Sequence, residues 1–224
     1  MAAVAVAPAA GRVALVAGAT GLVGQEVLAV LLTAKRYSDV HVIGRRALIE
    51  QHPRLVSHKV DFARLPPLPA LDDVYIALGT TIKVAGSREA FRAVDFAAVV
   101  AVAQAARKAG ATRLGVVSAM GANPTSRAFY NRVKGEMEEA VAALGFQTLV
   151  VARPSMLDGN RAALAQPTRI GEKIGLALMQ VLKPVIPANY RAIQASRVAQ
   201  TLVAAVLDGR AGTRLLLSGQ MQPA

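Results

Sequence analysis

The chain has 224 residues, 54% of them hydrophobic, which suits one domain with a sizeable core. It contains no cysteine, so disulfides, thiolate metal sites and cysteine nucleophiles are excluded. The formal net charge is +12, but the basic residues are scattered without interleaved aromatic residues, which does not favour nucleic acid as a partner. The three histidines lie at none of the spacings typical of a metal site, and we expect no metal ion.

The N-terminal segment Met1 to Ala10 is apolar, but it has no positively charged region and is too short for a signal peptide. No stretch of about 18 uncharged apolar residues indicates a membrane-spanning helix. We therefore expect a cytoplasmic protein.

Short apolar runs alternate with helical segments along the chain. The first run, residues 13–17, is bounded by glycines and is typical of a strand buried on both faces of a parallel sheet. The alternation predicts an α/β protein with a doubly wound, mostly parallel sheet and helices on both faces, the Rossmann fold, in a single domain of residues 1–224. The expected strands are 13–17, 40–44, 55–60, 74–78, 114–117, 148–152 and 215–217. The expected helices are one that ends near residue 35 and those at 90–109, 129–144 and 196–207.

A glycine-rich segment joins the first expected strand to the first expected helix. Glycines allow a tight turn and a close approach of the backbone to a pyrophosphate, and the helix N-terminus beyond them offers free N–H groups. The alternative is a turn that only packs the helix on the sheet. The position after the first strand favours binding of a dinucleotide. The residues expected to contact it are Gly18, Thr20, Gly21, Leu22, Val23 and Gly24.

Two adjacent arginines, Arg45 and Arg46, follow the second expected strand. At this point of a dinucleotide-binding fold, an acidic residue binds the ribose 2′-hydroxyl of NAD, whereas arginine accommodates the 2′-phosphate of NADP. The alternative is a pair of solvated loop charges. We expect NADPH to be preferred over NADH.

Two further strand ends carry candidate nucleotide contacts. Asp61 can accept a hydrogen bond from the adenine amino group and Phe62 can pack near the ring, although Asp61 can equally cap a turn. After the fourth strand, Leu78, Gly79 and Thr80 leave room for the adenosine ribose and diphosphate, or form a simple turn.

Tyr130 and Lys134 stand one helical turn apart, and Ser118 follows the fifth expected strand. A phenol has a pKa of about 10, and a nearby ammonium group lowers it. A serine hydroxyl that reaches the same substrate oxygen would complete a proton-donating site. Each of the three could instead be a surface or turn residue. Because the carboxyl ends of parallel strands meet at one edge, we expect them to face the dinucleotide.

Together these motifs resemble an atypical branch of the short-chain dehydrogenase/reductase family, and within it the group of the Tat-interacting protein TIP30, also called CC3. The resemblance covers about residues 13 to 160. It rests on the glycine loop, Leu78-Gly79-Thr80-Thr81, the stretch from Ala90 to Asp95, Val117-Ser118-Ala119-Met120-Gly121-Ala122, Phe129-Tyr130-x-x-x-Lys134-Gly135-Glu136 and Arg153-Pro154-Ser155.

The resemblance implies an NADP(H) cofactor and a set of roles. Tyr130 would donate or accept the proton at a substrate carbonyl or alcohol, Lys134 would hold the nicotinamide ribose, and Ser118 would position the substrate oxygen. Arg153, Pro154 and Ser155 would lie beside the nicotinamide. Some members of this group are regulatory or partner-binding proteins, which leaves an NADPH-binding protein without turnover as the alternative to an oxidoreductase.

The C-terminal third, from about residue 155 to 224, is expected to complete the pocket of an unidentified small-molecule substrate. Its segment 171–187 is apolar with flanking basic residues. Three interpretations stay open for this segment: a lid over the pocket, a contact in a homodimer, or a helix that binds a membrane surface.

Overall fold

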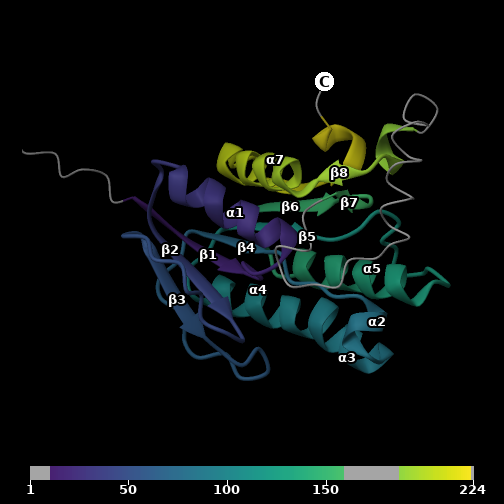
Figure 1. Cartoon of the computed structure of the whole chain (residues 1–224), viewed down its shortest axis with the longest axis horizontal. Coiled ribbons are helices and arrows are strands. Elements are labelled where there is room, and N and C mark those ends of the chain that lie inside the picture. The colour runs from purple at the N-terminus through teal and green to yellow at the C-terminus, as the bar shows by residue number, and fades with distance from the viewer. Residues whose placement is uncertain (1–10, 159–186, 223–224) are drawn as a thin grey trace, which may run out of the picture.

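The computed structural model describes residues 11–158 and 187–222. A seven-stranded parallel sheet runs through its middle, in the order β3-β2-β1-β4-β5-β6-β9, and helices cover both faces (Figure 1). The predicted fold class is confirmed. The strands of the sheet are β1 Arg12–Ala17, β2 Tyr37–Gly44, β3 Leu55–Lys59, β4 Asp73–Ile76, β5 Arg113–Val117, β6 Thr148–Arg153 and β9 Gly212–Leu217.

The helices follow the strands in the order expected for a doubly wound fold. They are α1 Leu22–Thr33, α2 Ile82–Ala85, α3 Arg88–Arg92, α4 Val99–Lys108, α5 Phe129–Ala142 and α7 Ala195–Asp208. A π-helical segment, η1 Ala93–Ala98, joins α3 to α4. Two short strands, β7 Leu157–Asp158 and β8 Ile193–Gln194, pair with each other. The 3-10 helix η3 Ala188–Tyr190 precedes β8, and the 3-10 helix η4 Ser218–Met221 follows β9.

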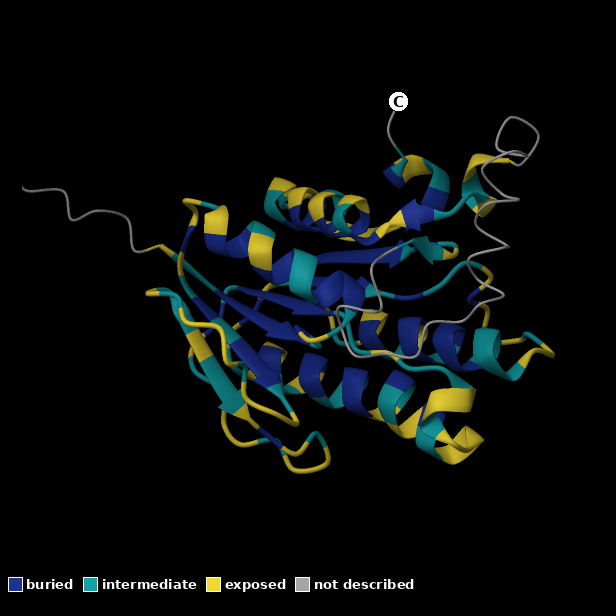
Figure 2. Ribbon diagram, in the orientation of Figure 1, coloured by how far each residue is buried: buried dark blue, intermediate teal, exposed yellow. Residues whose placement is uncertain are grey.

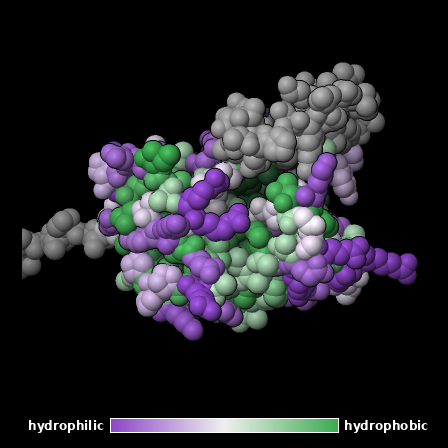
Figure 3. Space-filling model, turned by 60° about the horizontal axis from the view of Figure 1, so that its bottom comes forward, coloured by the Kyte–Doolittle hydropathy of each residue, from purple (hydrophilic) through white to green (hydrophobic). Residues whose placement is uncertain are grey.

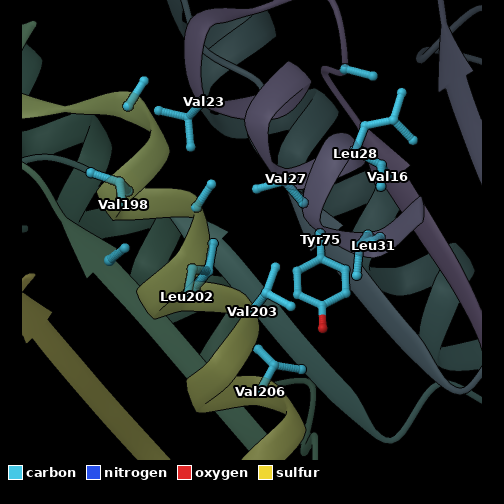
Figure 4. Packing of buried hydrophobic residues seen from close by; sticks show 14 of the residues in the cluster. Val16, Val23, Val27, Leu28, Leu31, Tyr75, Val198, Leu202, Val203 and Val206 are labelled. Carbon is cyan, nitrogen blue, oxygen red and sulfur yellow. The ribbon is translucent and has the colours of Figure 1, made fainter. Parts of the chain in front are cut away.

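The central strands are buried along almost their whole length, which is the reason for their continuous apolar runs (Figure 2). On one face of the sheet, α1 and α7 pack side by side (Figure 4). Val27 and Leu31 of α1 face Val203 and Val206 of α7 across this cluster, and all four are essentially inaccessible to solvent. Burial of each such side chain contributes about 1.5–3 kcal/mol, so this layer holds β1 and its glycine loop in place.

The opposite face is covered by α4 and α5. Val102 and Ala106 of α4 and Met137 and Val141 of α5 belong to a second core cluster with strands β4 and β5. This layer matters for function because α5 carries the candidate catalytic residues. Packing of Met137 and Val141 fixes the rotation of α5 about its axis.

A buried polar network joins the strands at the edge of the sheet remote from the strands' carboxyl ends. The fully buried Asp73 accepts hydrogen bonds from Arg12 at 2.7 and 2.8 Å and from the Tyr37 hydroxyl at 2.8 Å. The Tyr75 hydroxyl lies 2.8 Å from that of Tyr37, and burial raises the pKa of both phenols far above the usual range. Every charge here has a partner, so the network is a structural clamp on β1, β2 and β4.

Some element boundaries differ from the sequence-based expectation. The fourth strand was expected to reach Leu78, but it ends at Ile76 because the chain then turns away from the sheet into the Gly79–Thr80 loop. Helix α2 and the β7–β8 pair were not predicted, since two to four residues give no readable periodicity. The apolar segment 171–187 lies outside the described residues except for Pro187, as does Met1 to Ala10.

On the face of the molecule seen in Figure 3, hydrophobic and hydrophilic residues are interspersed. Exposed arginines, among them Arg88, Arg92 and Arg127, belong to α3 and to the loop before α5. Within the two described ranges, none of the helices combines the length and the apolar character needed to cross a membrane.

Candidate active site

The direction in which strands are added to the sheet reverses after β3. The chain runs from β1 through α1 to β2 and on to β3, and then returns to add β4 on the other side of β1. In open parallel sheets, the crevice beyond the strand ends at such a switch point is where ligands bind. The glycine loop follows β1 and the Gly79–Thr80 loop follows β4. Both segments therefore border the same crevice.

The glycine loop has no room for a side chain at Gly18 or at Gly24. Gly18 has φ +93°, and a Cβ atom at this position would lie 2.6 Å from the Ala77 carbonyl oxygen. A Cβ atom on Gly24 would lie 2.0 Å from the Gly18 carbonyl oxygen. Gly21 caps the N-terminus of α1 without a side-chain hydrogen bond, which leaves the first N–H groups of the helix without an intrahelical partner. This arrangement fits a pyrophosphate.

The other predicted loop residues divide into two groups. Leu22 and Val23 are buried in the core between α1 and α7, so only their backbone N–H groups can face a ligand. Thr20 is exposed at the turn.

Arg45 and Arg46 follow β2 and are both exposed. Neither side chain forms an ion pair or hydrogen bond with any residue of 11–158 or 187–222. Two guanidinium groups are thus available at the end of the second strand, where an anionic group on the adenosine ribose would lie.

Asp61 and Phe62 follow β3, as the sequence indicated. Asp61 also has the alternative role considered for it, which is to cap a turn. Asp61 Oδ1 accepts a hydrogen bond of 2.9 Å from the backbone N–H of Ala63, which closes a turn. The Asp61 residue as a whole is exposed. Phe62 is partly buried against the core cluster under α4.

Lys134 lies buried at the crevice, paired with a carboxylate. Its Nζ is 2.7 Å from Asp95 Oδ1, and the side chains are 4% and 0% exposed. The second oxygen of Asp95 accepts a hydrogen bond of 2.9 Å from the backbone N–H of Thr80. Burial raises the pKa of the Asp95 carboxyl, although both partners favour its charged form.

Asp95 was not among the predicted site residues. The available signal was a single acidic residue within an apolar run, Ala93-Val94-Asp95-Phe96-Ala97-Ala98. A charge inside an apolar helix is rare unless it has a partner, but the sequence does not say which partner it has.

Tyr130 lies half-buried one turn before Lys134, and its ring packs on Phe91 with the centroids 5.3 Å apart. Its hydroxyl forms no hydrogen bond within the described part of the chain. Burial raises the pKa of the Tyr130 phenol; Lys134 lowers it and Asp95 raises it. The expected lowering of this pKa is therefore wrong for the ligand-free protein, because burial and the Asp95 charge outweigh the ammonium group.

Ser118 follows β5 and is 5% exposed. Its backbone N–H donates to the Ala152 carbonyl oxygen at 2.7 Å, which holds it at the end of the sheet. Its hydroxyl has no hydrogen-bond partner among the residues described. A buried hydroxyl without a partner is costly, so it is available to bind a ligand oxygen.

Arg153, Pro154 and Ser155 connect the end of β6 to the rest of the site. The Arg153 guanidinium donates to Glu138 of α5 at 2.5 and 3.0 Å, which neutralises its charge. The Pro154 carbonyl oxygen accepts a hydrogen bond from the Met120 N–H. The Ser155 hydroxyl lies 2.9 Å from that of Ser218, so this segment is tied to the C-terminal third of the chain.

The predicted residues thus lie at two places in the sheet. Gly18, Gly24, Gly79, Thr80 and Lys134 border the switch-point crevice, and Ser118 and Arg153 follow neighbouring strands β5 and β6. Arg45, Arg46 and Asp61 lie at the ends of β2 and β3.

The chain is similar in sequence to fungal proteins named FMP52, mitochondrial. It is 30% identical over 216 residues to the protein from Coccidioides immitis, with 88% of this chain and 87% of the relative covered. It is 38% identical over 160 residues to the protein from Aspergillus fumigatus, with 67% of this chain and 68% of the relative covered. No protein-family model matches the chain.

Solved structures share the fold at low sequence identity. MoeE5 in complex with UDP-glucose and NAD superimposes with a TM-score of 0.69 at 17% identity, covering 92% of this chain and 75% of MoeE5. A short chain dehydrogenase family protein from Francisella tularensis gives a TM-score of 0.70 at 15% identity, covering 94% of this chain and 99% of that protein. These similarities establish the Rossmann-like fold of short-chain dehydrogenases.

The relatives also correct one expectation. The Coccidioides and Aspergillus proteins both carry the word mitochondrial in their names. The expectation of a cytoplasmic protein, drawn from the absence of a signal peptide, is therefore contradicted. The reason is that such a signal reports on secretion and does not distinguish among compartments inside the cell.

Proposed function

The chain belongs to the FMP52 protein family, and we propose that it is an NADPH-dependent oxidoreductase of the short-chain dehydrogenase/reductase type that acts through this site. One observation carries the proposal. The buried Lys134 amine sits against Gly79, where an added Cβ atom would lie 3.8 Å from Nζ. This contact puts the amine at the β1–β4 switch point, one turn from Tyr130.

A bound nicotinamide would supply or accept the hydride at the substrate carbon, and the chain's own residues manage the oxygen. The Tyr130 hydroxyl donates a proton to a carbonyl oxygen, or accepts one from an alcohol. The unpartnered Ser118 hydroxyl orients the same oxygen. Lys134 binds the nicotinamide ribose hydroxyls. Proton transfer by a positioned group of this kind contributes about 10²- to 10⁴-fold to the rate.

The preference for NADPH rests on Arg45 and Arg46. Their side chains are exposed and have no partner within the described ranges, so binding a 2′-phosphate requires no existing ion pair to be broken. Two guanidinium groups can form charge-assisted hydrogen bonds with the phosphate oxygens, whereas the 2′-hydroxyl of NADH offers no charge.

The substrate pocket is proposed to involve the C-terminal third, which Ser155 and Ser218 join to the end of β6. The likeness of the sequence motifs to the TIP30-like group agrees with this assignment and also keeps a regulatory NADPH-binding role as the second candidate.

The test is to incubate the full chain with NADPH and a panel of aldehydes and ketones and to follow the nicotinamide absorbance. For any carbonyl that is reduced, Tyr130→Phe should lose at least about 100-fold in turnover and keep its NADPH affinity. Ser38→Ala is the control, because it removes an exposed hydroxyl at the start of β2, at the edge of the sheet remote from the site, and it should behave like the parent. Wild-type turnover by the Tyr130 variant would refute the proposed mechanism. Tight NADPH binding without oxidation across the panel would favour the regulatory protein.

A further inference from the structure

Asp95 lies within an irregular turn of helix. Residues 88–108 form a continuous helical stretch, within which Ala93–Ala98 are π-helical. A π-turn is rare, is less favourable than the α-helix and is frequently found at functional sites. Here it carries a carboxylate that is completely buried.

Three neighbours make this buried charge tolerable. Lys134 supplies the opposite charge at 2.7 Å, and the Thr80 N–H donates to the other oxygen at 2.9 Å. Gly79 has no side chain, and a Cβ atom there would be in contact with Asp95 Oδ1 at 3.4 Å. Removing one partner from such a pair is costly because it leaves an uncompensated buried charge. The Gly79-Thr80 motif therefore makes room for Asp95 and donates a hydrogen bond to it, in addition to any contact that it makes with a ligand.

We propose that Asp95 is a positioning residue that holds the Lys134 ammonium group beside Gly79 and offsets part of the positive charge that this group presents to Tyr130. This inference rests on the proposed function and deepens it by naming a residue that acts on the acid, through Lys134, when a carbonyl compound is reduced.

The proposed reaction is the reduction of a carbonyl compound, with NADPH as the reductant. A hydride is transferred to the carbonyl carbon as the Tyr130 O–H bond breaks and its proton joins the carbonyl oxygen. The products are an alcohol, NADP⁺ and a tyrosinate, which regains its proton from water. Asp95 takes no part in bond making and acts only through Lys134.

The charges that act on Tyr130 make the inference testable. Among the residues that the structure describes, Lys134 on α5 favours the phenolate and Asp95 on η1 disfavours it. Removing the Asp95 charge while Lys134 is kept should therefore let Tyr130 ionise at lower pH. A purely structural role for Asp95 makes no such prediction.

The experiment uses the ligand-free chain. Phenol ionisation is followed by ultraviolet absorbance, and the Tyr130 contribution is isolated by subtracting the titration of the matching Tyr130→Phe variant. Asp95→Asn keeps the size of the side chain and an oxygen for the Thr80 N–H, but removes the charge. We expect Tyr130 to ionise about one pH unit lower than in the parent. Glu136→Gln is the control, because Glu136 lies on α5 with Tyr130 and Lys134 but is paired with Arg92 and not with either residue of the buried Asp95–Lys134 pair.

An unchanged or higher ionisation pH in Asp95→Asn, with circular dichroism showing a folded chain, would overturn the proposal. If Asp95→Asn does not fold because Lys134 is left buried without a counter-charge, the double variant Asp95→Asn/Lys134→Met is used instead. It removes both charges of the pair. Its Tyr130 should ionise at a pH no lower than in the parent, because the Lys134 charge is also lost. A lower value would equally overturn the proposal.

NADPH binding provides the second measurement and separates this inference from the proposed function. Asp95→Asn and Lys134→Met should each weaken NADPH binding by about tenfold, and the double variant should be no weaker than Lys134→Met, since Asp95 acts through Lys134. Additive losses would overturn the positioning role. A parent chain that binds no NADPH would refute the proposed function alone, and the titration of the ligand-free chain would still decide the role of Asp95.

Discussion

Replacing Gly21 by alanine would separate the stability of the glycine loop from its capacity to bind a nucleotide. Gly21 has φ −90° and ψ 165°, a conformation that alanine adopts without strain. A Cβ atom there would lie 3.4 Å from the Gly18 carbonyl oxygen and 3.9 Å from that of Ala77, which are ordinary contacts. The side chain therefore fits the ligand-free protein.

The expected change in stability is small. Glycine is the better helix N-cap by up to about 1 kcal/mol, and alanine gains about 0.4–1 kcal/mol by restricting the unfolded chain. These effects offset each other, so we expect the free energy of unfolding in urea to change by less than about 0.5 kcal/mol. NADPH affinity, measured by nicotinamide fluorescence, should fall at least about tenfold, because the methyl group occupies the path of the pyrophosphate.

Gly24→Ala is the contrasting variant. Its Cβ atom would lie 2.0 Å from the Gly18 carbonyl oxygen, a backbone atom that cannot move without the loop. We expect a loss of about 1–3 kcal/mol in stability together with the loss of NADPH binding. A folded Gly21→Ala variant that binds NADPH as tightly as the parent would refute the assignment of this loop to the pyrophosphate.

Three further predictions concern the specificity, the pH dependence and the core. Arg45→Ala with Arg46→Ala should remove most of the preference for NADPH over NADH in paired binding titrations; equal affinities in the parent would already contradict the assignment. Burial and the histidine on the neighbouring strand lower the pKa of His41, so the unfolded chain binds the proton more readily. The folded chain should thus lose stability as pH falls below 6.5, the ordinary pKa of histidine. His41→Gln should reduce this loss in urea unfolding measured across that pH range; an unaltered pH profile would rule out a role for His41. Leu202→Ala, at a fully buried position, should cost about 2–5 kcal/mol, whereas Leu215→Ala, at a position 45% exposed, should cost far less; similar losses would count against the packing described for α7.

The fold could be predicted from local patterns because each strand and helix carries its own periodicity. The run at residues 13–17 is apolar without interruption, and β1 is buried on both faces as that run indicates. The short pieces could not be predicted. Helix α2 has four residues, and the π-helical segment has the composition of an ordinary apolar helix. It contains Asp95, whose contact with Lys134 is long-range in the sequence.

The candidate site was only partly visible in the sequence. Tyr130, Lys134 and Ser118 could be proposed because their spacing and their position after strands are local features. The residues that pair with the site residues could not be predicted from the sequence. Asp95 is 39 residues from Lys134 in the numbering, and Glu138 is 15 residues from the Arg153 that it binds. No periodicity connects such positions.

Local patterns in the chain were enough to predict the alternation of the main strands and helices, the glycine loop and the types of side chain available for acid–base chemistry. These are properties of neighbouring residues, set by backbone sterics and by the alternation of apolar and polar positions. The electrostatics of the site, in contrast, could be described only from the folded chain. The predicted lowering of the Tyr130 pKa considered one neighbouring charge, whereas the folded chain adds burial and the Asp95 carboxylate, which together reverse its sign. Burial and distant charges depend on how the layers pack, and that information is not held in any one segment of the chain.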